Sequence, residues 1–400
     1  MKLLIHTTAF VLAATLMTFA QSSSKQFINL GPSLGLPFSS AVKAGGLVYV
    51  SGAIAVDESG NVIAGDVKAQ TRQLLETMDA RLKAGGSSLA NAASVLVYLA
   101  NASDFAAMNE VYRTFWQKDP PARTTVVAPL VLPGGLVEIS AIGIPNGAER
   151  RVIHPSDWIQ SPNPYSYGIK TGNTLFLSGL VSRNGKDNTT VKGDITAQTK
   201  TVLDNGKAIL EAAGMTTADV VSARVFLTDS SMFQAMNATY RPYFAASPPA
   251  RATVRTGLSS PDYLVEIAMV AVRDPSRKAI TTPNADGSAG TPNPNLSSAI
   301  AVGNRLYVAG LLGNTEANKG DVKAQTTETL ARAARTLKAA GFDWPDVVEG
   351  MVYLPQLSTF DQMNAAYRAV LTKDFPARTT IGAGLMNPDG AVEIMFTAVK

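Results

Sequence analysis

The sequence predicts three consecutive domains of the α/β (α+β) class, each a mixed sheet with two helices on one face. A polar pattern recurs three times in a single register: an Asp, then Asn-x-x-Tyr, then Pro-Ala-Arg, then Val-Glu-Ile. In every copy the Asp lies 57 residues before the Arg, and the Arg lies 15 residues before the Glu. A long repeat that keeps its register indicates repeated folding units. With 400 residues and 46% hydrophobic content, the chain is large enough for three cores.

Each copy shows the same order of predicted elements, β-β-β-α-β-α-β-β. In the first copy, residues 46–52 are rich in β-branched and aromatic side chains, which predicts a strand. Residues 57–61 have the composition of a hairpin turn. Asp66 is placed to cap a helix that ends at the glycines of positions 85 and 86. The remaining elements are a strand at 93–99, a helix at 104–116 and strands at 124–130 and 136–144.

The repeat and the composition of the intervening segments give the domain boundaries. We expect the three repeat units at residues 27–146, 151–273 and 290–400. Segments rich in Pro, Gly, Asn and Ser at 145–164 and 273–295 are interpreted as linkers.

The first 20 residues have the pattern of an export signal. Lys2 gives a positive start, residues 3–17 are mostly apolar, and Thr18-Phe19-Ala20 fits a small-x-small cleavage site. The alternative, a membrane anchor, requires a longer apolar run. We therefore expect residues 1–20 to be removed and the mature protein to be periplasmic or secreted, with no contact to the membrane.

Composition excludes several kinds of site. The chain has no Cys and two His, so disulfides, thiolate metal sites and three copies of a Ser-His-Asp triad are ruled out. We expect no metal. A formal net charge of +4 with no basic run does not favour nucleic acid as a partner.

The repeated Arg and Glu are the main candidates for chemistry. A guanidinium at the start of an apolar strand needs an anion, which is either a ligand or the Glu of the following strand of the same copy. A Glu between Val and Ile in a strand is partly buried, so its pKa can be raised, which suits a general base acting on water. The candidate catalytic residues are Arg123, Glu138, Arg251, Glu266, Arg378 and Glu393.

The Asn-x-x-Tyr pairs place an amide and a phenol on the same face of a helix. We interpret the Tyr as packing residues and the three Asp that begin the long helices as caps.

Together these motifs resemble the YjgF/RidA family, the reactive intermediate deaminases, which are also known as endoribonuclease L-PSP. The resemblance rests on the Ser-Gly after the first strand, Gly-Asp-x-x-x-Gln-Thr, Met-Asn-x-x-Tyr, and Pro-Ala-Arg-x-Thr followed by Val-Glu-Ile. It implies a chorismate-mutase-like fold and homotrimers with ligand pockets between subunits. Three linked copies are then expected to form an intramolecular pseudo-trimer that is a monomer in solution.

The resemblance also implies a reaction that needs no cofactor. The Arg binds the carboxylate of a small 2-imino or enamino acid, and the Glu activates water against the imine carbon, giving a 2-oxo acid and ammonia. The positions that the resemblance assigns to substrate binding are Tyr165, Ser51, Ser178, Asn109, Asn237 and Asn364. The third copy departs from the pattern, with Leu296 in place of the aromatic residue and Ala309 in place of the Ser.

Two alternatives remain at this point. One is a non-catalytic module that binds small carboxylic acids, which the substitutions in the third copy favour. The other is an endoribonuclease, although the near absence of His and the small net charge do not favour RNA cleavage. Export would also separate the protein from cytoplasmic sources of imines, so its substrate could differ from that of the family.

Overall fold

The computed structural model describes residues 25–32, 34–244 and 247–400, so the predicted export signal at 1–20 lies outside the described residues. In the first copy the order is β-β-β-α-β-α-β-β, as predicted. Its elements are β1 (Gln26–Ile28), β2 (Ala41–Ala44), β3 (Leu47–Ile54), α1 (Val67–Ala84), β4 (Ala92–Leu99), α2 (Phe105–Phe115), β5 (Ala122–Val127) and β6 (Val137–Gly143).

The other two copies repeat this order and each adds a two-residue strand before its last strand. The second has β7 (Arg151–Ile153), β8 (Gly168–Thr171), β9 (Thr174–Leu177), α3 (Ile195–Ala212), β10 (Val220–Leu227), α4 (Phe233–Tyr240), β11 (Ala250–Arg255), β12 (Gly257–Leu258) and β13 (Val265–Val272). The third has β14 (Lys278–Ile280), β15 (Ala299–Val302), β16 (Arg305–Leu312), α5 (Val322–Ala339), β17 (Val347–Leu354), α6 (Phe360–Val370), β18 (Ala377–Gly382), β19 (Gly384–Leu385) and β20 (Glu393–Val399).

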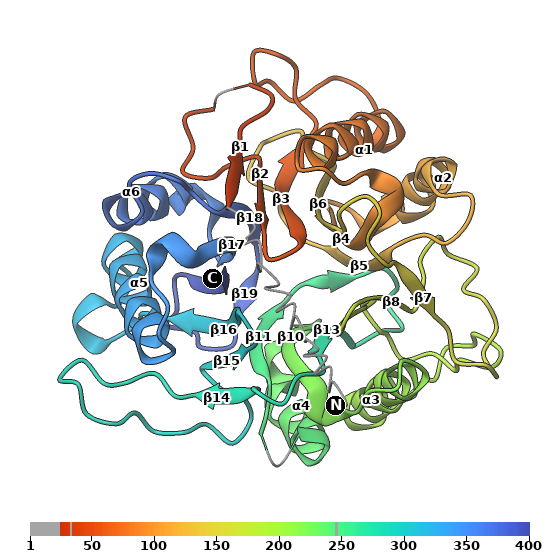
Figure 1. Ribbon diagram of the computed structural model, residues 1–400. Coiled ribbons are helices and arrows are strands. Elements are labelled where there is room, and N and C mark those ends of the chain that lie inside the picture. Colours follow the sequence, from red (N-terminus) through yellow and green to blue (C-terminus); the bar gives the residue numbers. More distant parts are fainter. Residues whose placement is uncertain (1–24, 33, 245–246) are drawn as a thin grey trace, which may run out of the picture.

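The long helix of each copy begins where the sequence predicts. The Asp66 carboxylate accepts a hydrogen bond from the Ala69 N–H at 2.9 Å, and the equivalent aspartates of the other copies cap α3 and α5 in the same way. Capping satisfies an N–H that has no partner inside the helix. Leu74 and Met78 then recur at helical spacing and are buried against the sheet. The helix pair therefore covers one face of each sheet, as Figure 1 shows for α1 and α2.

The three sheets share one topology. In the first copy the strands lie in the order β1-β2-β3-β6-β4-β5, and β4 and β5 are parallel while the other neighbours are antiparallel. The turn predicted at 57–61 is present, but the hairpin is reduced to one bridge, between Val56 and Val62. The third strand of the copy is instead β1, near the start of the described chain.

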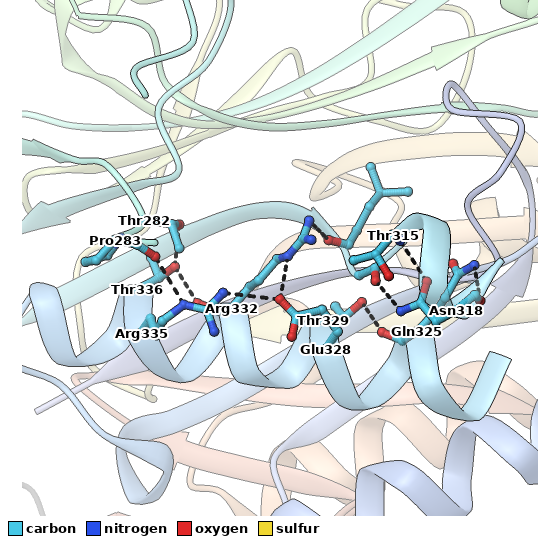
Figure 2. A network of polar contacts seen from close by, with 12 residues as sticks. Thr282, Pro283, Thr315, Asn318, Gln325, Glu328, Thr329, Arg332, Arg335 and Thr336 are labelled. Carbon is cyan, nitrogen blue, oxygen red and sulfur yellow. Dashed lines mark hydrogen bonds and ion pairs between the residues drawn. The ribbon is translucent and has the colours of Figure 1, made fainter. Parts of the chain in front are cut away.

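The segments interpreted as linkers carry short edge strands. Strand β7 pairs with β8, and β14 pairs with β15 ahead of residue 290, the expected start of the third domain. Three-residue strands give too short a pattern to be recognised in a Pro- and Gly-rich segment. The second segment is also held on helix α5, where the Thr282 and Thr336 hydroxyls lie 2.6 Å apart and Arg335 Nε donates to the Pro283 carbonyl oxygen (Figure 2).

The copies are joined into a closed ring by strand pairing. Strand β12 of the second copy extends the first sheet beside β5, and β19 of the third copy extends the second sheet beside β11. A bridge between Leu130 and Ile381 makes the third connection, from the first copy to the third. Figure 1 shows the resulting pseudo-threefold arrangement, with the helices outside and the sheets inside. The expected intramolecular pseudo-trimer is therefore present.

The inner faces of the sheets meet in a shared core. Tyr98, Phe226 and Tyr353 occupy equivalent positions on β4, β10 and β17 and are almost fully buried there. This core is not fully symmetric, because Arg224 and Glu349 form an ion pair of 3.8 Å between the second and third copies. In the described part of the chain, no helix is long and apolar enough to cross a membrane.

Candidate functional site

The ring creates three clefts, and each combines an Arg of one copy with a Glu of another. Arg378 lies near Glu138, Arg123 near Glu266, and Arg251 near Glu393. We refer to them as the Arg378, Arg123 and Arg251 clefts. All six candidate catalytic residues are therefore brought together in pairs.

The alternative of an Arg–Glu salt bridge within one copy is not what the structure shows. Arg123 lies on β5 and Glu138 on β6. These strands follow each other in the sequence, but β4 lies between them in the sheet, so the two residues are not on neighbouring strands. Among the described residues, none of the ion pairs within 4.0 Å includes Arg123, Arg251 or Arg378. The pairing of the two residues depends on docking of the copies.

Each guanidinium lies over the aromatic ring of the Asn-x-x-Tyr motif. The distance from the guanidinium carbon to the ring centroid is 4.7 Å for Arg123 over Tyr112, and the other two pairs lie at 4.6 and 4.9 Å. The first residue of the same helix, Phe105 in the first copy, flanks the cation at 5.8 Å. Cation–π contact stabilises a buried positive charge without neutralising it. The Tyr thus pack, as predicted, and they pack against the candidate Arg.

The Asn of the motif holds the Arg in two of the three copies. Asn364 Oδ1 accepts from Arg378 Nη2 at 2.7 Å, and Asn237 Oδ1 accepts from Arg251 Nη2 at 2.6 Å. Asn109 is buried, but its Oδ1 has no partner. The three Asn, predicted as substrate-binding, therefore lie beside the arginine side chains, and two of them orient the guanidinium.

The guanidinium groups still lack a partner on their other terminal nitrogen. Nη1 of Arg123, Arg251 and Arg378 is buried and makes no hydrogen bond. Burial lowers the pKa of Arg378 to about 10, which leaves the group protonated at neutral pH. An unpaired buried donor is costly, and it recurs in all three clefts, so each Arg retains a donor that an anionic group can accept from.

The three Glu are buried as carboxyl groups with one anchored oxygen. Glu266 Oε1 accepts from the Thr125 N–H at 3.2 Å, and Glu138 and Glu393 accept from the equivalent N–H of Thr380 and Thr253. Burial raises the pKa of each Glu to about 8, while the backbone donor and the Arg oppose the shift. Glu138 Oε2 is buried without a partner. This second oxygen is the one available to water or ligand.

A glycine is required beside each Glu. A Cβ on Gly52 would lie 2.1 Å from Glu138 Oε1 and 2.8 Å from the Thr379 methyl group of the neighbouring copy. Likewise, a Cβ on Gly179 would lie 2.0 Å from Glu266 Oε1, and one on Gly310 would lie 1.9 Å from Glu393 Oε1. The Gly of the Ser-Gly motif therefore leaves room for the Glu of its own copy to pack against the strand that carries the Arg of the neighbouring copy.

The Ser of this motif joins two copies. Ser178 Oγ accepts from the Arg123 N–H at 2.8 Å and donates to the Ser166 carbonyl oxygen at 2.7 Å. Ser51 makes the same pair of bonds, to Arg378 and Ser39. Both hydroxyls are thus used within the protein, and they fix the Arg strand instead of facing a ligand. Their role in substrate binding stays a prediction.

The departures of the third copy fall in the Arg251 cleft. Ala309 is buried where the other clefts have a Ser, and Leu296 packs against the same cluster as Ala250. In the other two clefts, an aromatic ring lies over the Arg at this position: Phe38 over Arg378 at 5.5 Å and Tyr165 over Arg123 at 5.9 Å. The Arg251 cleft therefore lacks both the hydroxyl and the ring.

The Arg378 and Arg123 clefts contain cavities of different size. The first has a volume of about 530 Å³ and is lined by Arg378, Glu138 and Phe38 among others. The second has about 230 Å³ and includes Arg123, Glu266 and Tyr165. Each is large enough for a small carboxylic acid and brings together a cation and an uncharged carboxyl group.

Sequence reasoning did not single out several residues at these clefts. The backbone N–H groups of Thr125 and its equivalents carry no sequence signal, because any residue but Pro supplies them. Arg81 on α1, which also lines the larger cavity, differs from its counterparts in the repeat, and comparing the copies could have revealed it. In the described residues, no three His, Asp or Glu side chains are grouped to hold a metal ion. The His154 ring forms a hydrogen bond with the Trp158 carbonyl oxygen.

Fold and site together define a class of protein: a ring of three α+β units with a buried Arg and a buried Glu at each cleft between neighbours. The sequence model for this class, described as Endoribonuclease L-PSP, matches the chain at residues 32–144, 156–273 and 288–400. The chain belongs to this family, in three tandem copies.

The relatives found correspond to single copies. A RutC family protein of Sulfurisphaera tokodaii is 49% identical over 107 residues, which is 27% of this chain and 86% of the relative. The mitochondrial protein mmf2 of Schizosaccharomyces pombe is 44% identical over 113 residues, 28% of this chain and 89% of the relative.

Solved structures were also matched. The YjgF gene product from E. coli is 35% identical and spans 31% of this chain and 98% of its own, with a TM-score of 0.29. A chorismatase is 14% identical, covers 77% of this chain and 93% of its own, and has a TM-score of 0.52, a likeness of fold alone.

Proposed function

We propose that the Arg378 and Arg123 clefts hydrolyse small 2-imino acids, and enamino acids after tautomerisation, to 2-oxo acids and ammonia. The observation that carries this proposal is the buried, unpartnered Nη1 of each Arg facing a buried Glu from the neighbouring copy. Such a pair offers a binding group for a carboxylate and a proton carrier beside it. Membership of the family supports the same reaction class.

The Arg holds the carboxylate of the substrate. A guanidinium presents a planar set of donors that matches a carboxylate, and in the Arg378 cleft Asn364 already fixes Nη2. Phe38 and Tyr367 keep the cation in place and exclude water from its faces. The substrate carbon next to the carboxylate is thereby presented to the cavity.

Glu138 carries the proton in the Arg378 cleft, as Glu266 does in the Arg123 cleft. The water oxygen forms a bond to the imine carbon, its proton passes to ionised Oε2, and Oε2 delivers that proton to the nitrogen. The resulting carbinolamine loses ammonia as the C–N bond breaks, and the hydroxyl proton leaves with the nitrogen. The Glu138 carboxyl group stays anchored to the Thr380 N–H, which fixes its orientation.

The Arg251 cleft has a different role in this proposal. Arg251 and Glu393 are present, but Leu296 replaces the ring that the neighbouring copy lends to the other two Arg, and Ala309 leaves the Arg strand without its hydroxyl contact. We propose that this cleft binds small carboxylates weakly and contributes little turnover. This is the place in the molecule where the non-catalytic alternative applies.

An endoribonuclease activity, which the family description names, ranks below hydrolysis of imines. RNA cleavage near neutral pH uses a proton-transfer pair and a basic surface for phosphates. The net charge is only +4, and each Glu lies near a buried Arg in a cleft between two copies. Steeply salt-dependent binding of RNA would favour this alternative.

We also propose that the protein is exported, on the pattern of residues 1–20. The expected result is a mature N-terminus at Gln21 and recovery of the protein outside the cytoplasm. N-terminal sequencing of the fractionated protein tests this, and an intact Met1 in the cytoplasmic fraction would contradict it.

The main test is release of ammonia and 2-oxo acid from imino acids generated in the assay by an amino-acid oxidase. We expect acceleration by the wild-type protein, partial loss in Arg123→Ala and in Arg378→Ala, and nearly full loss in the double variant. Arg251→Ala is the matched control, with little effect expected. Absence of acceleration by folded wild-type protein would reject the proposal and leave the binding module.

A further inference from the structure

Arg81 is a second arginine in the cavity of the Arg378 cleft. Its Nε and Nη1 are buried and make no hydrogen bond, and burial lowers its pKa to about 10. None of the ion pairs within 4.0 Å in the described residues includes this side chain. A desolvated cation without an acid to compensate it is destabilising unless something else supplies the negative charge.

The fold itself does not need an arginine at this place. Arg81 lies fifteen residues after the helix-capping Asp66, and the equivalent positions are Ile209 and Thr336. Ile209 is fully buried in the apolar core of its copy. Thr336 Oγ1 donates to the Arg332 carbonyl oxygen and contacts the Thr282 hydroxyl at 2.6 Å, as Figure 2 shows. Both counterparts are satisfied within the protein, whereas Arg81 is not.

The Arg123 cleft provides an informative contrast. It also contains a second arginine, Arg183, but that guanidinium is engaged: Nε donates to Asn188 Oδ1 at 2.8 Å, Nη1 to Tyr263 Oη at 2.6 Å, and Nη2 to the Asn188 carbonyl oxygen. Among the described residues, the cavity of the Arg378 cleft carries two arginines with free donors, whereas that of the Arg123 cleft carries one. That cavity is also more than twice as large.

We propose that the Arg378 cleft takes a dicarboxylate, with one carboxylate on Arg378 and the second on Arg81. This rests on the proposed function for its chemistry, since the substrate would then be the imine of a dicarboxylic amino acid. The wall of the same cavity also includes Ile54 and Phe27, which suits a methylene chain joining two charged ends. The acid Asp374 also lines the cavity but is exposed at its edge.

The electrostatics of the cavity agree with two negative charges. Arg81 and Arg378 both keep their protons at neutral pH, since the pKa of each is about 10. Glu138 is largely uncharged there because burial raises its pKa to about 8. The buried groups therefore carry an excess of positive charge that one carboxylate alone does not neutralise.

Binding is tested by calorimetry with glutarate and butyrate on the chain carrying Arg123→Ala and Arg251→Ala, which leaves one competent Arg. Glutarate is expected to bind about tenfold or more tightly than butyrate. Arg81→Ile, which installs the residue of the second copy, should remove that preference and leave butyrate affinity within about twofold. The control is Arg72→Ile, which removes an exposed charge from the same helix and should preserve the preference.

The chain with Arg123→Ala and Arg251→Ala could fold poorly. The Arg81→Ile and Arg72→Ile substitutions are therefore also measured in the otherwise wild-type chain. There, Arg81→Ile should remove the tight glutarate site and keep the circular-dichroism spectrum. Equal affinity of glutarate and butyrate before substitution, or an equal effect of the two substitutions, would overturn the proposal.

Kinetics separate this inference from the proposed function. With 2-iminoglutarate and 2-iminobutyrate, Arg81→Ile should lower kcat/KM for the first by about tenfold and change the second little. Hydrolysis of both imines with no effect of Arg81→Ile would reject the second anion site and keep the reaction. Selective glutarate binding without hydrolysis of either imine would reject the reaction and keep the second site.

Discussion

Ser51 Oγ accepts a hydrogen bond of 2.8 Å from the backbone N–H of Arg378, a residue 327 positions further along the chain. The same hydroxyl donates to the Ser39 carbonyl oxygen of its own copy. One side chain thus fixes the start of the Arg strand of the third copy against the first. The clefts are accordingly properties of the docked ring and not of any single copy.

Removing this contact should weaken the ring. Ser51→Ala is expected to lower the free energy of unfolding by about 1 kcal/mol, because the buried Arg378 N–H loses its acceptor. Chemical denaturation measures the change, and Ser59→Ala, at an exposed position, is the control. The reverse change, Ala309→Ser, should stabilise the Arg251 cleft by a similar amount. No difference between Ser51→Ala and the control would contradict the role of the hydroxyl.

The raised pKa of Glu138 predicts a pH-dependent stability. The folded state keeps its proton up to about pH 8, whereas an unfolded Glu releases it near the ordinary value of 4.5. Stability contributed by the group is therefore complete below about 4.5 and is lost as pH rises to about 8. In the Glu138→Gln variant, the free energy of unfolding should fall less steeply with pH in this window, by about 1.4 kcal/mol per pH unit. Urea titrations at several pH values test this, and identical slopes would refute it.

The reaction should depend on the ionised form of the same residue. Because only ionised Oε2 accepts the water proton, kcat/KM is expected to rise about tenfold per pH unit below the pKa of about 8 and to level off above it. The profile is measured with an imine whose own protonation is determined separately. Glu138→Gln combined with Glu266→Gln should leave little activity. A rate that falls through this range would mean that the neutral acid is the active form.

Glycine at position 52 should be essential to one cleft only. Gly52→Ala brings a methyl group to 2.1 Å from Glu138 Oε1, so it should displace the carboxyl group and remove activity of the Arg378 cleft. Gly179→Ala is the matched substitution for the Arg123 cleft. With glutarate as ligand, Gly52→Ala should abolish tight binding and Gly179→Ala should spare it. The opposite pattern would mean that the clefts are wrongly assigned.

The closed ring predicts one chain per particle. The copies pair with each other within one chain through β12, β19 and the Leu130–Ile381 bridge, so these edges are not available to a second chain. Light scattering should therefore give about the mass of one full-length chain, 42.0 kDa, or slightly less after processing. A mass three times larger would show that whole chains assemble further.

Much of the fold could be predicted because its signals are local. Asp66, the apolar spacing of Leu74 and Met78, and the glycines after them define α1 closely, and the repeat transfers this to the other copies. The candidate Arg and Glu were also recognisable as repeated polar residues in apolar strands. These features depend on side chains a few residues apart.

The rest depends on contacts between distant residues. The order β5-β4-β6 separates Arg123 from Glu138, and no local pattern shows that Glu266 takes its place. The Ser hydroxyls looked like ligand contacts because their partners, backbone groups of another copy, leave no sequence signal. In the sequence, Arg81 cannot be distinguished from an exposed arginine on a helix, and only the folded structure shows that it lines a cavity.

Every cleft has two walls from two different copies, so each copy serves two clefts with different parts of its surface. The third copy has lost Ser and an aromatic ring on the wall that it lends to Arg251, yet it still provides an intact Arg378 to the first copy. Substitutions can accumulate on one wall without affecting the other. In a fused chain, the wall that each copy contributes to a cleft can therefore change independently, so one cleft can be conserved, another enlarged and a third inactivated. A trimer of identical subunits cannot do this, because every substitution appears in all three clefts.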